Sequence, residues 1–218
     1  GAAGVIIGGI SNTGLNLTFA HQIIKICHSS LPLALVLVAI VALILGMGMT
    51  TTAVYVTVAV IMAPALVNMG VDLLAAHLFC FYFGCINAIT PPVCVASFTA
   101  AGIAGGSPSK TGWISFRLGL LAFLIPFIFV YQPSLILQAG TFPTILLAAV
   151  TAAVGCWAFG VSLEGFFKTE VALWQRALWC VGGVLLLIPG FVTDVVGIAL
   201  VALAFILQKA SFAKLVKS

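Results

Sequence analysis

The chain has 218 residues, of which 63% are hydrophobic and 6% are charged, with a net charge of +4. An average soluble domain is about 25% charged, and the mean hydropathy here is +1.34, so the composition excludes a soluble globular fold. The basic residues lie at the boundaries of apolar runs and form no basic stripe, so no nucleic-acid partner is indicated. The sequence predicts an all-α polytopic membrane protein embedded in a lipid bilayer.

The chain enters apolar sequence at once. It starts at Gly1 without an initiator Met, a basic segment or a signal-peptide cleavage pattern, and we expect it to be part of a longer protein. Asn12-Thr13-Gly14 follows a glycine-rich segment. Two interpretations remain open for it: an unwound point near a cavity, or, more simply, a helix that ends at Gly14.

A re-entrant hairpin is predicted in the charge-free run 26–71. Its two apolar arms, Leu31–Leu45 and 53–67, flank Gly46-Met47-Gly48-Met49-Thr50-Thr51-Thr52. Each arm would be about 22 Å long as a helix, short of the roughly 30 Å hydrocarbon core. A polar tip between two short arms can lie at membrane depth where protein or a water-filled cavity satisfies its backbone. Pro64 is expected to end or kink the second arm.

A broken helix is predicted next. The sequence Asn87-Ala88-Ile89-Thr90-Pro91-Pro92 separates the apolar segments Leu73–Ile86 and 93–103. Proline has no N–H to donate, so carbonyls around 86–90 are expected to lose their helical hydrogen-bond donors. Free carbonyls at membrane depth are candidate cation ligands.

Two ordinary spans follow, at 113–131 with a kink expected at Pro126, and at 142–163. The stretch between Glu164 and Arg176 is the most polar part of the chain and is expected to be a loop at the membrane interface. Aromatic residues on both sides of it are typical of such an interface: Phe166, Phe167, Trp174 and Trp179.

The last apolar run, 177–207, is interrupted by Ile188-Pro189-Gly190. It is too long for one untilted span and too short for two, so a second hairpin is favoured over a single kinked helix. Thr193-Asp194 either places a carboxylate in the membrane or caps the second arm, and the cap fits first.

The charges predict an orientation. If both hairpins return to their own side and the broken helix crosses once, Lys25 and Asp72 share one face. The other face then carries Lys110, Arg117, Lys168, Arg176, Lys209, Lys214 and Lys217. The positive-inside rule assigns that face to the cytoplasm, so the first hairpin enters from outside. Anionic lipid would attract the basic C-terminal end.

Catalytic motifs are not found, so no enzyme activity and no cofactor are predicted. The histidines have no partner acid and are interpreted as solvated or locally hydrogen-bonded: His21, His28 and His77. The cysteines form no metal or redox motif and are interpreted as small apolar core residues: Cys27, Cys80, Cys85, Cys94, Cys156 and Cys180.

The threonine-rich tip and the Thr-Pro-Pro break together suggest a transport site. Thr hydroxyls and unpaired carbonyls are hard, uncharged oxygen ligands that suit Na⁺, and broken helices are where secondary transporters bind substrates and coupling ions. Each element alone has a structural alternative, a Pro kink packed by Ser/Thr or glycines that allow close helix approach. Their occurrence within a short stretch favours the transporter.

Two motifs closely resemble the large permease component of tripartite ATP-independent periplasmic (TRAP) transporters. They are residues 45–55, with Gly46-Met47-Gly48-Met49-Thr50-Thr51-Thr52, and residues 88–93, with Thr90-Pro91-Pro92. Residues 100–105, 110–113 and 126–131 also resemble that family in order and spacing. The match is closest to the fused permeases of the TAXI subclass.

The similarity covers about residues 1–137, which we expect to form the second-repeat permease region. Trp174-Gln175-Arg176 and residues 188–194 resemble the extra membrane module of some fused members. Residues 138–218 are therefore expected to form a C-terminal transmembrane module.

The resemblance implies a Na⁺-coupled secondary transporter of the bacterial inner membrane that imports an organic anion, a carboxylate, delivered by a periplasmic solute-binding protein. It implies an elevator-type fold of two inverted repeats, of which this chain supplies the second and lacks the N-terminal one.

The implied Na⁺ site comprises Gly46, Gly48, Thr50, Thr51, Thr52, Asn87, Thr90, Pro91 and Pro92, with Thr51, Thr52 and Thr90 also at the substrate. Family members commonly carry Pro where this chain has Thr50. The alternative function is a non-transporting structural or assembly subunit, which residues 138–218 alone would fit better.

Overall fold

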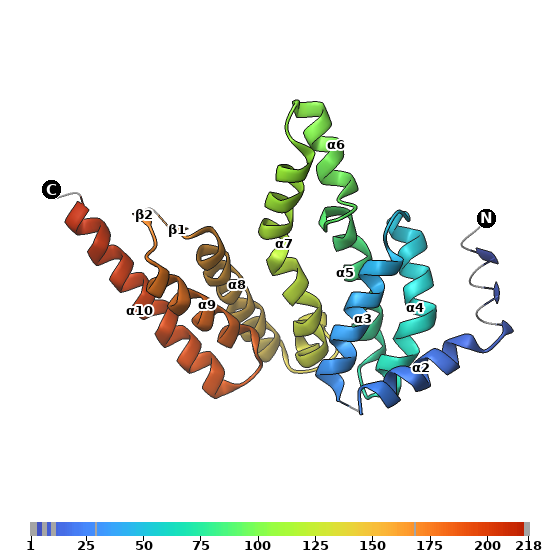
Figure 1. Ribbon diagram of the computed structural model, residues 1–218. Coiled ribbons are helices and arrows are strands. Elements are labelled where there is room, and N and C mark those ends of the chain that lie inside the picture. Colours follow the sequence, from blue (N-terminus) through green and yellow to red (C-terminus); the bar gives the residue numbers. More distant parts are fainter. Residues whose placement is uncertain (1–3, 6–7, 10–11, 29, 168, 216–218) are drawn as a thin grey trace. The chain divides into compact units, whose positions relative to one another are not determined.

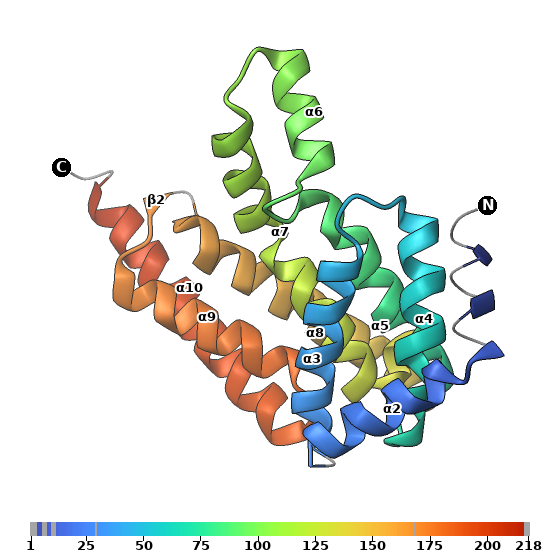
Figure 2. The ribbon, with the colours of Figure 1, turned by 45° about the vertical axis from the view of Figure 1, so that its right-hand side comes forward.

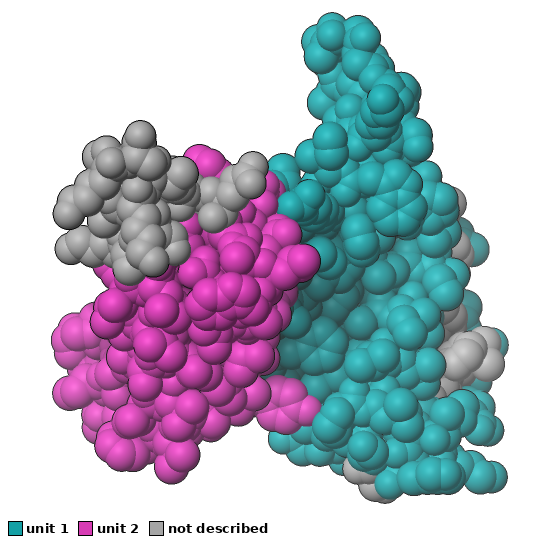
Figure 3. All heavy atoms as spheres, turned by 60° about the vertical axis from the view of Figure 1, so that its left-hand side comes forward, with its two compact units in different colours: residues 1–130 teal, residues 131–218 magenta. Residues whose placement is uncertain are grey.

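Helices form almost the whole chain, as expected of apolar segments that must satisfy their own backbone groups in a bilayer. The computed structural model describes residues 4–5, 8–9, 12–28, 30–167 and 169–215. They divide into two compact units, 1–130 (unit 1) and 131–218 (unit 2) (Figure 3). Four described helices are long and apolar enough to span a membrane: Thr51–Asn68, Pro108–Tyr131, Phe142–Glu164 and Phe191–Gln208. The predicted all-α polytopic membrane fold is confirmed.

Unit 1 contains the predicted hairpin. After α2 (Leu15–Ile26), α3 (Leu31–Leu45) leads to a short tip and α4 (Thr51–Asn68) returns beside it (Figure 1). Of the two outcomes expected at Pro64, an end of the second arm is wrong, because α4 continues through it, and a kink stays a prediction. Helix α4 packs against α2 and α5, and this packing retains a helical turn that the local sequence disfavours.

The predicted break follows in unit 1. Helix α5 (Leu73–Ile86) passes into the 3-10 turn η1 (Asn87–Ile89), and the chain becomes helical again only in α6 (Val95–Ala104). Helix α7 (Pro108–Tyr131) then runs back along α6 (Figure 2). It starts earlier than predicted and remains helical through Pro126. A Cβ at Gly112 of α7 would lie 3.2 Å from Cys94 Sγ, so the start of α6 rests directly on α7.

Unit 2 begins with η2 (Pro133–Ile136) and contains α8 (Phe142–Glu164), α9 (Leu173–Leu187) and α10 (Phe191–Leu215). Two-residue strands, β1 (Phe166–Phe167) and β2 (Thr169–Glu170), pair between α8 and α9. Helix α9 packs against both α8 and α10, which confirms the second hairpin. Glycines permit these close approaches: a Cβ at Gly155 would lie 2.9 Å from the Gly183 carbonyl oxygen.

The polar stretch of unit 2 contains the expected connection, between the end of α8 at Glu164 and the start of α9 at Leu173, although Trp174, Arg176 and Trp179 belong to α9. Arg176 donates from Nε to the Ser162 carbonyl, 3.1 Å, and from Nη2 to the Leu163 carbonyl, 2.9 Å, at the C-terminal end of α8. Trp179 is fully buried, with its ring 5.3 Å from that of Trp157. Its assignment to an interfacial aromatic belt is therefore wrong, because it lies inside α9 and faces the bundle core.

Two cap assignments can also be compared with the structure. Helix α10 begins at Phe191, so Asp194 lies in its first turn, and its backbone N–H donates to the Gly190 carbonyl. The predicted cap at Thr193-Asp194 is wrong because the helix starts directly after Pro189-Gly190. Gly14 has φ +67° and immediately precedes α2. The helix expected to end there lies partly outside the described residues, as do Lys168 and Lys217.

Candidate functional site

The hairpin tip and the helix break meet at a cavity of about 510 Å³ within unit 1. Four helix ends reach it: the C-terminal ends of α3 and α5 and the N-terminal ends of α4 and α6. The lining residues are Gly46, Gly48, Met49, Thr50, Thr51, Gly84, Asn87, Ala88, Val93, Val95 and Ala96.

Gly46 of the tip lies directly against Asn87 of the break. A Cβ placed on Gly46 would lie only 2.9 Å from Asn87 Cγ and 3.0 Å from the Ala42 carbonyl oxygen, so no side chain fits there. Asn87 is 6% exposed. The two motifs that the sequence singled out are therefore in direct contact.

The tip needs a second glycine for a different reason. Gly48 has φ +80°, a conformation that side chains with a Cβ rarely adopt. Thr50 has φ −71° and ψ 149°, which are also the angles that proline adopts. Threonine at the position where the resembling family commonly has proline is thus compatible with the same backbone.

The sequence predicted that the carbonyls around 86–90 lose their hydrogen-bond donors, but several of them keep one. The Thr90 hydroxyl donates to the Ile86 carbonyl, 2.8 Å, and the Thr90 N–H donates to the Asn87 carbonyl, 3.1 Å. The Thr90 carbonyl in turn accepts from the Cys94 N–H, 3.2 Å. The expectation is wrong for these three carbonyls, because Thr90 turns back toward α5 and Cys94 turns back toward Thr90. The Thr90 hydroxyl oxygen still has lone pairs with which to accept or to ligate.

The backbone carbonyl of Ala88 is the one that loses its helical hydrogen-bond donors, as predicted. The donors that a 3-10 or α-helix would supply to it belong to the third and fourth following residues, which are Pro91 and Pro92. Neither has an N–H. Ala88 also lines the cavity, so the carbonyl that the helix cannot satisfy belongs to a residue at the site.

The N-terminal ends of α4 and α6 bring N–H groups to the same cavity. Neither helix has a side-chain cap. In α4 the first helical hydrogen bond runs from Val54 N to the Thr50 carbonyl, 3.0 Å. In α6 it runs from Phe98 N to the Cys94 carbonyl, 2.9 Å. The three N–H groups before each of these bonds have no acceptor within their helix and form its positive end.

The remaining predicted residues are placed differently. Thr90 and Pro91 line a second, smaller cavity of about 200 Å³ together with Asn87. Thr52 and Pro92 line neither of these two cavities.

Six lining residues are not among the predicted site residues: Met49, Gly84, Ala88, Val93, Val95 and Ala96. Their side chains carry no ionisable or hydroxyl group. Val95 and Ala96 matter through their backbone, and the signal that could have indicated them is the restart of helix after the Pro-Pro pair.

Among the described residues, no three His, Cys, Asp or Glu side chains lie together as metal ligands would. The oxygen groups that line the cavity are neutral hydroxyls, an amide and carbonyls. Such a donor set suits a weakly held monovalent cation rather than a transition metal.

Comparison with known families decides the class of protein. The model of the tripartite ATP-independent periplasmic transporter, DctM component, matches residues 1–145. The chain belongs to the DctM family. The predicted resemblance to the large permease component is thereby confirmed, and the assignment to the fused TAXI subclass stays a prediction. This DctM protein is a TRAP permease, a multi-pass protein of the inner membrane and a member of a transporter family rather than an enzyme family.

The C-terminal part has a second similarity. The model of the FxsA cytoplasmic membrane protein matches residues 118–208, which include α8 and α9 and overlap the end of the DctM match. This part of the DctM protein is therefore similar to another membrane family. No curated protein and no solved structure matches the chain.

Proposed function

We propose that this chain is the second inverted repeat of an elevator-type permease that couples Na⁺ entry to the import of an organic carboxylate. The observation that carries the proposal is the convergence of four helix ends on one cavity. Two of these ends bring oxygen ligands and two bring N–H groups, which is the arrangement expected where a cation and an anion bind together.

The cation is assigned to the C-terminal ends of α3 and α5. Carbonyl oxygens of the tip around Gly46 and Gly48, and the Ala88 carbonyl that no helical N–H can reach, are its proposed ligands at this cavity. All are neutral, so removing Na⁺ would leave no uncompensated charge in the membrane. This allows the ion to bind and leave during a transport cycle.

The carboxylate is assigned to the N-terminal ends of α4 and α6. The free N–H groups there can donate to carboxylate oxygens, and the positive ends of both helix dipoles favour the anion. The Thr51 hydroxyl lines the cavity and supplies a further donor. Thr52 would contribute through its backbone N–H rather than its side chain, since Thr52 does not line the cavity.

We further propose that a periplasmic binding protein delivers the solute and that an N-terminal repeat of the same polypeptide completes the cavity. Residues 131–218 then form an additional module, as in fused permeases. The alternative function, a non-transporting structural or assembly subunit, fits this module better, because its glycines and the buried Trp179 serve helix packing.

The proposal is tested by comparing Thr51→Val with Thr52→Val in the full-length protein reconstituted in proteoliposomes. The two substitutions are chemically identical and one residue apart, and only Thr51 lines the cavity. Loss of a charge-assisted hydrogen bond should weaken solute binding about ten-fold in Thr51→Val, seen as a raised KM for solute. Thr52→Val keeps its N–H and should stay within about two-fold of wild type.

Equal KM values in both variants and in wild type would count against the site. Protein inserted per liposome, measured by labelling, is the control for expression and folding.

A further inference from the structure

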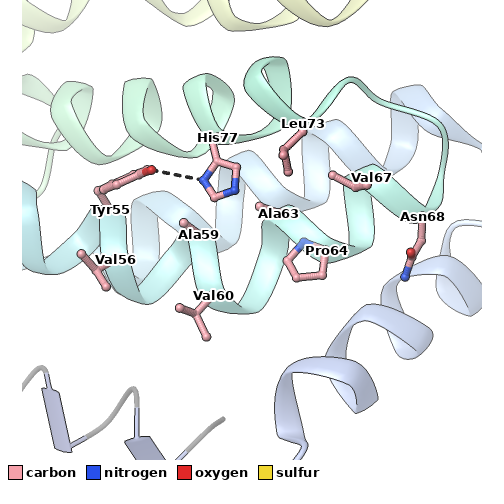
Figure 4. A pocket seen from close by; sticks show the side chains of 10 residues that line it. All are labelled: Tyr55, Val56, Ala59, Val60, Ala63, Pro64, Val67, Asn68, Leu73 and His77. Carbon is pink, nitrogen blue, oxygen red and sulfur yellow. Dashed lines mark hydrogen bonds between the residues drawn. The ribbon is translucent and has the colours of Figure 1, made fainter.

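A tyrosine and a histidine form a hydrogen bond between the hairpin arm and the broken helix. Tyr55 of α4 and His77 of α5 lie with Oη and Nδ1 3.1 Å apart. Both side chains line an apolar groove of about 660 Å³ beside the two helices (Figure 4). An ionisable side chain on an apolar helix of a membrane protein indicates function when its partner can be named.

The pair belongs to a line of contacts that begins at the transport cavity. Gly84, which lines that cavity, lies against Val54, with 3.4 Å between its would-be Cβ and Val54 Cγ1. Next along α5, the Phe81 ring packs edge-on against Tyr55 with 5.6 Å between ring centroids. One turn further along α5, His77 shares the hydrogen bond with the Tyr55 hydroxyl. Residues 84, 81 and 77 share one face of α5 because they are three and four residues apart.

These contacts constrain α4 to different degrees. Apolar contacts such as Val54 on Gly84 tolerate small sliding movements, because dispersion attraction is not directional. A hydrogen bond depends on both distance and angle and weakens steeply when either changes. The bond from Tyr55 to His77 is therefore the contact on this line that fixes how far α4 lies along α5.

That position matters for the cavity because Tyr55 is one helical turn after Thr51. A helix is rigid over one turn, so fixing Tyr55 also fixes the Thr51 hydroxyl and the free N–H groups at the start of α4. Binding sites need their groups held to about 0.5 Å. A shift of α4 along α5 would change the spacing between the hairpin tip and Ala88, which both line the cavity.

We propose that Tyr55 and His77 are positioning residues that hold the start of α4 at the depth on α5 required for ion binding. The inference rests on the proposed function, since it assigns the pair to the same ion site. Neither residue touches the ion. They act through the rigid connection from Tyr55 to Thr51 and from His77 to Asn87.

The test is Na⁺-titrated solute uptake in proteoliposomes containing the full-length protein. Tyr55→Phe keeps the ring packed on Phe81 and removes only the hydroxyl, and His77→Leu removes the other partner. Each should raise the half-saturating Na⁺ concentration about five-fold and change the maximal rate less than about two-fold. The double variant should be no worse than either single one, because both remove the same bond.

Two further variants separate positioning from general damage. His77→Asn places an amide near the Nδ1 position that can donate or accept, and it should restore half-saturation to within about two-fold of wild type. Tyr82→Phe removes a tyrosine hydroxyl from the same helix, α5, where the ring packs on Phe129, and should leave Na⁺ dependence unchanged.

The outcomes distinguish the two levels of the argument. Two results would overturn the positioning role alone, provided that wild-type uptake responds to Na⁺. In the first, Tyr55→Phe and His77→Leu leave the half-saturating Na⁺ concentration unchanged. In the second, their effects on that concentration add in the double variant. Wild-type uptake that ignores Na⁺ overturns the proposed function and this inference with it.

Discussion

At Gly46 the hairpin tip approaches the helix break so closely that no side chain fits between them. The sequence identified this glycine by its motif, and the structure adds the reason, which is the buried Asn87 amide. The partner of His77 could not be found in this way, because Tyr55 is 22 residues away in sequence and nothing in the local pattern joins them. Contacts of this kind depend on how helices pack.

Gly46→Ala should be strongly unfavourable. The added methyl would meet the Asn87 amide, so we expect the free energy of unfolding to fall by about 1–3 kcal/mol, as for overpacked cores, with loss of Na⁺-dependent uptake. Thermal unfolding of the detergent-solubilised protein measures the first effect.

The matched control is Gly102→Ala, at an exposed position in α6 with open space around the new methyl. There stability should be unchanged or slightly higher, since alanine favours helix. Adding Asn87→Ala to Gly46→Ala should recover part of the lost stability. A Gly46→Ala protein as stable as the Gly102→Ala protein would show that tip and break are not in contact.

Among the elements, the short hairpin arm α3 and the broken helix could be predicted because proline, glycine and length act locally. The bounds of α4 were predicted to within two residues, but its passage through Pro64 was not, since that depends on packing against neighbouring helices. The burial of Trp179 likewise depends on helix packing. The interruption before α10 was predicted from Pro189-Gly190, and only the cap at Thr193-Asp194 was wrong. At the site, the motifs of the tip and the break could be predicted. The contribution of the N-terminal end of α6 could not, because Val95 and Ala96 there have no polar side chain that would indicate a binding site.

The contact between α8 and α9 offers a prediction for unit 2. Gly155→Ala would push a methyl against the Gly183 carbonyl, 2.9 Å from the ideal Cβ, and should lower the free energy of unfolding by about 1–3 kcal/mol. Gly160→Ala on the same helix meets open space and serves as the control. Equal denaturation midpoints for the two variants in detergent would contradict the close glycine packing.

For the whole molecule, composition alone was enough to predict the class, and the DctM match confirms the family. Within unit 1, the start of α3, the end of α4 and the start of α5 lie at one end, and the turn from α6 to α7 lies at the other (Figure 1). This arrangement agrees with a hairpin that returns to its own side. The cytoplasmic assignment of Lys110 stays a prediction, because it follows from charge counting alone.

The central claim is coupling of Na⁺ to carboxylate import. Its most direct measurement is uptake of a labelled organic carboxylate by proteoliposomes that contain the full-length protein, supplied with its periplasmic binding protein, under an inward Na⁺ gradient or an equal K⁺ gradient. We predict accumulation with Na⁺ only, lost when an ionophore dissipates the gradient. Equal uptake with K⁺, or uptake that persists without any gradient, would contradict the account.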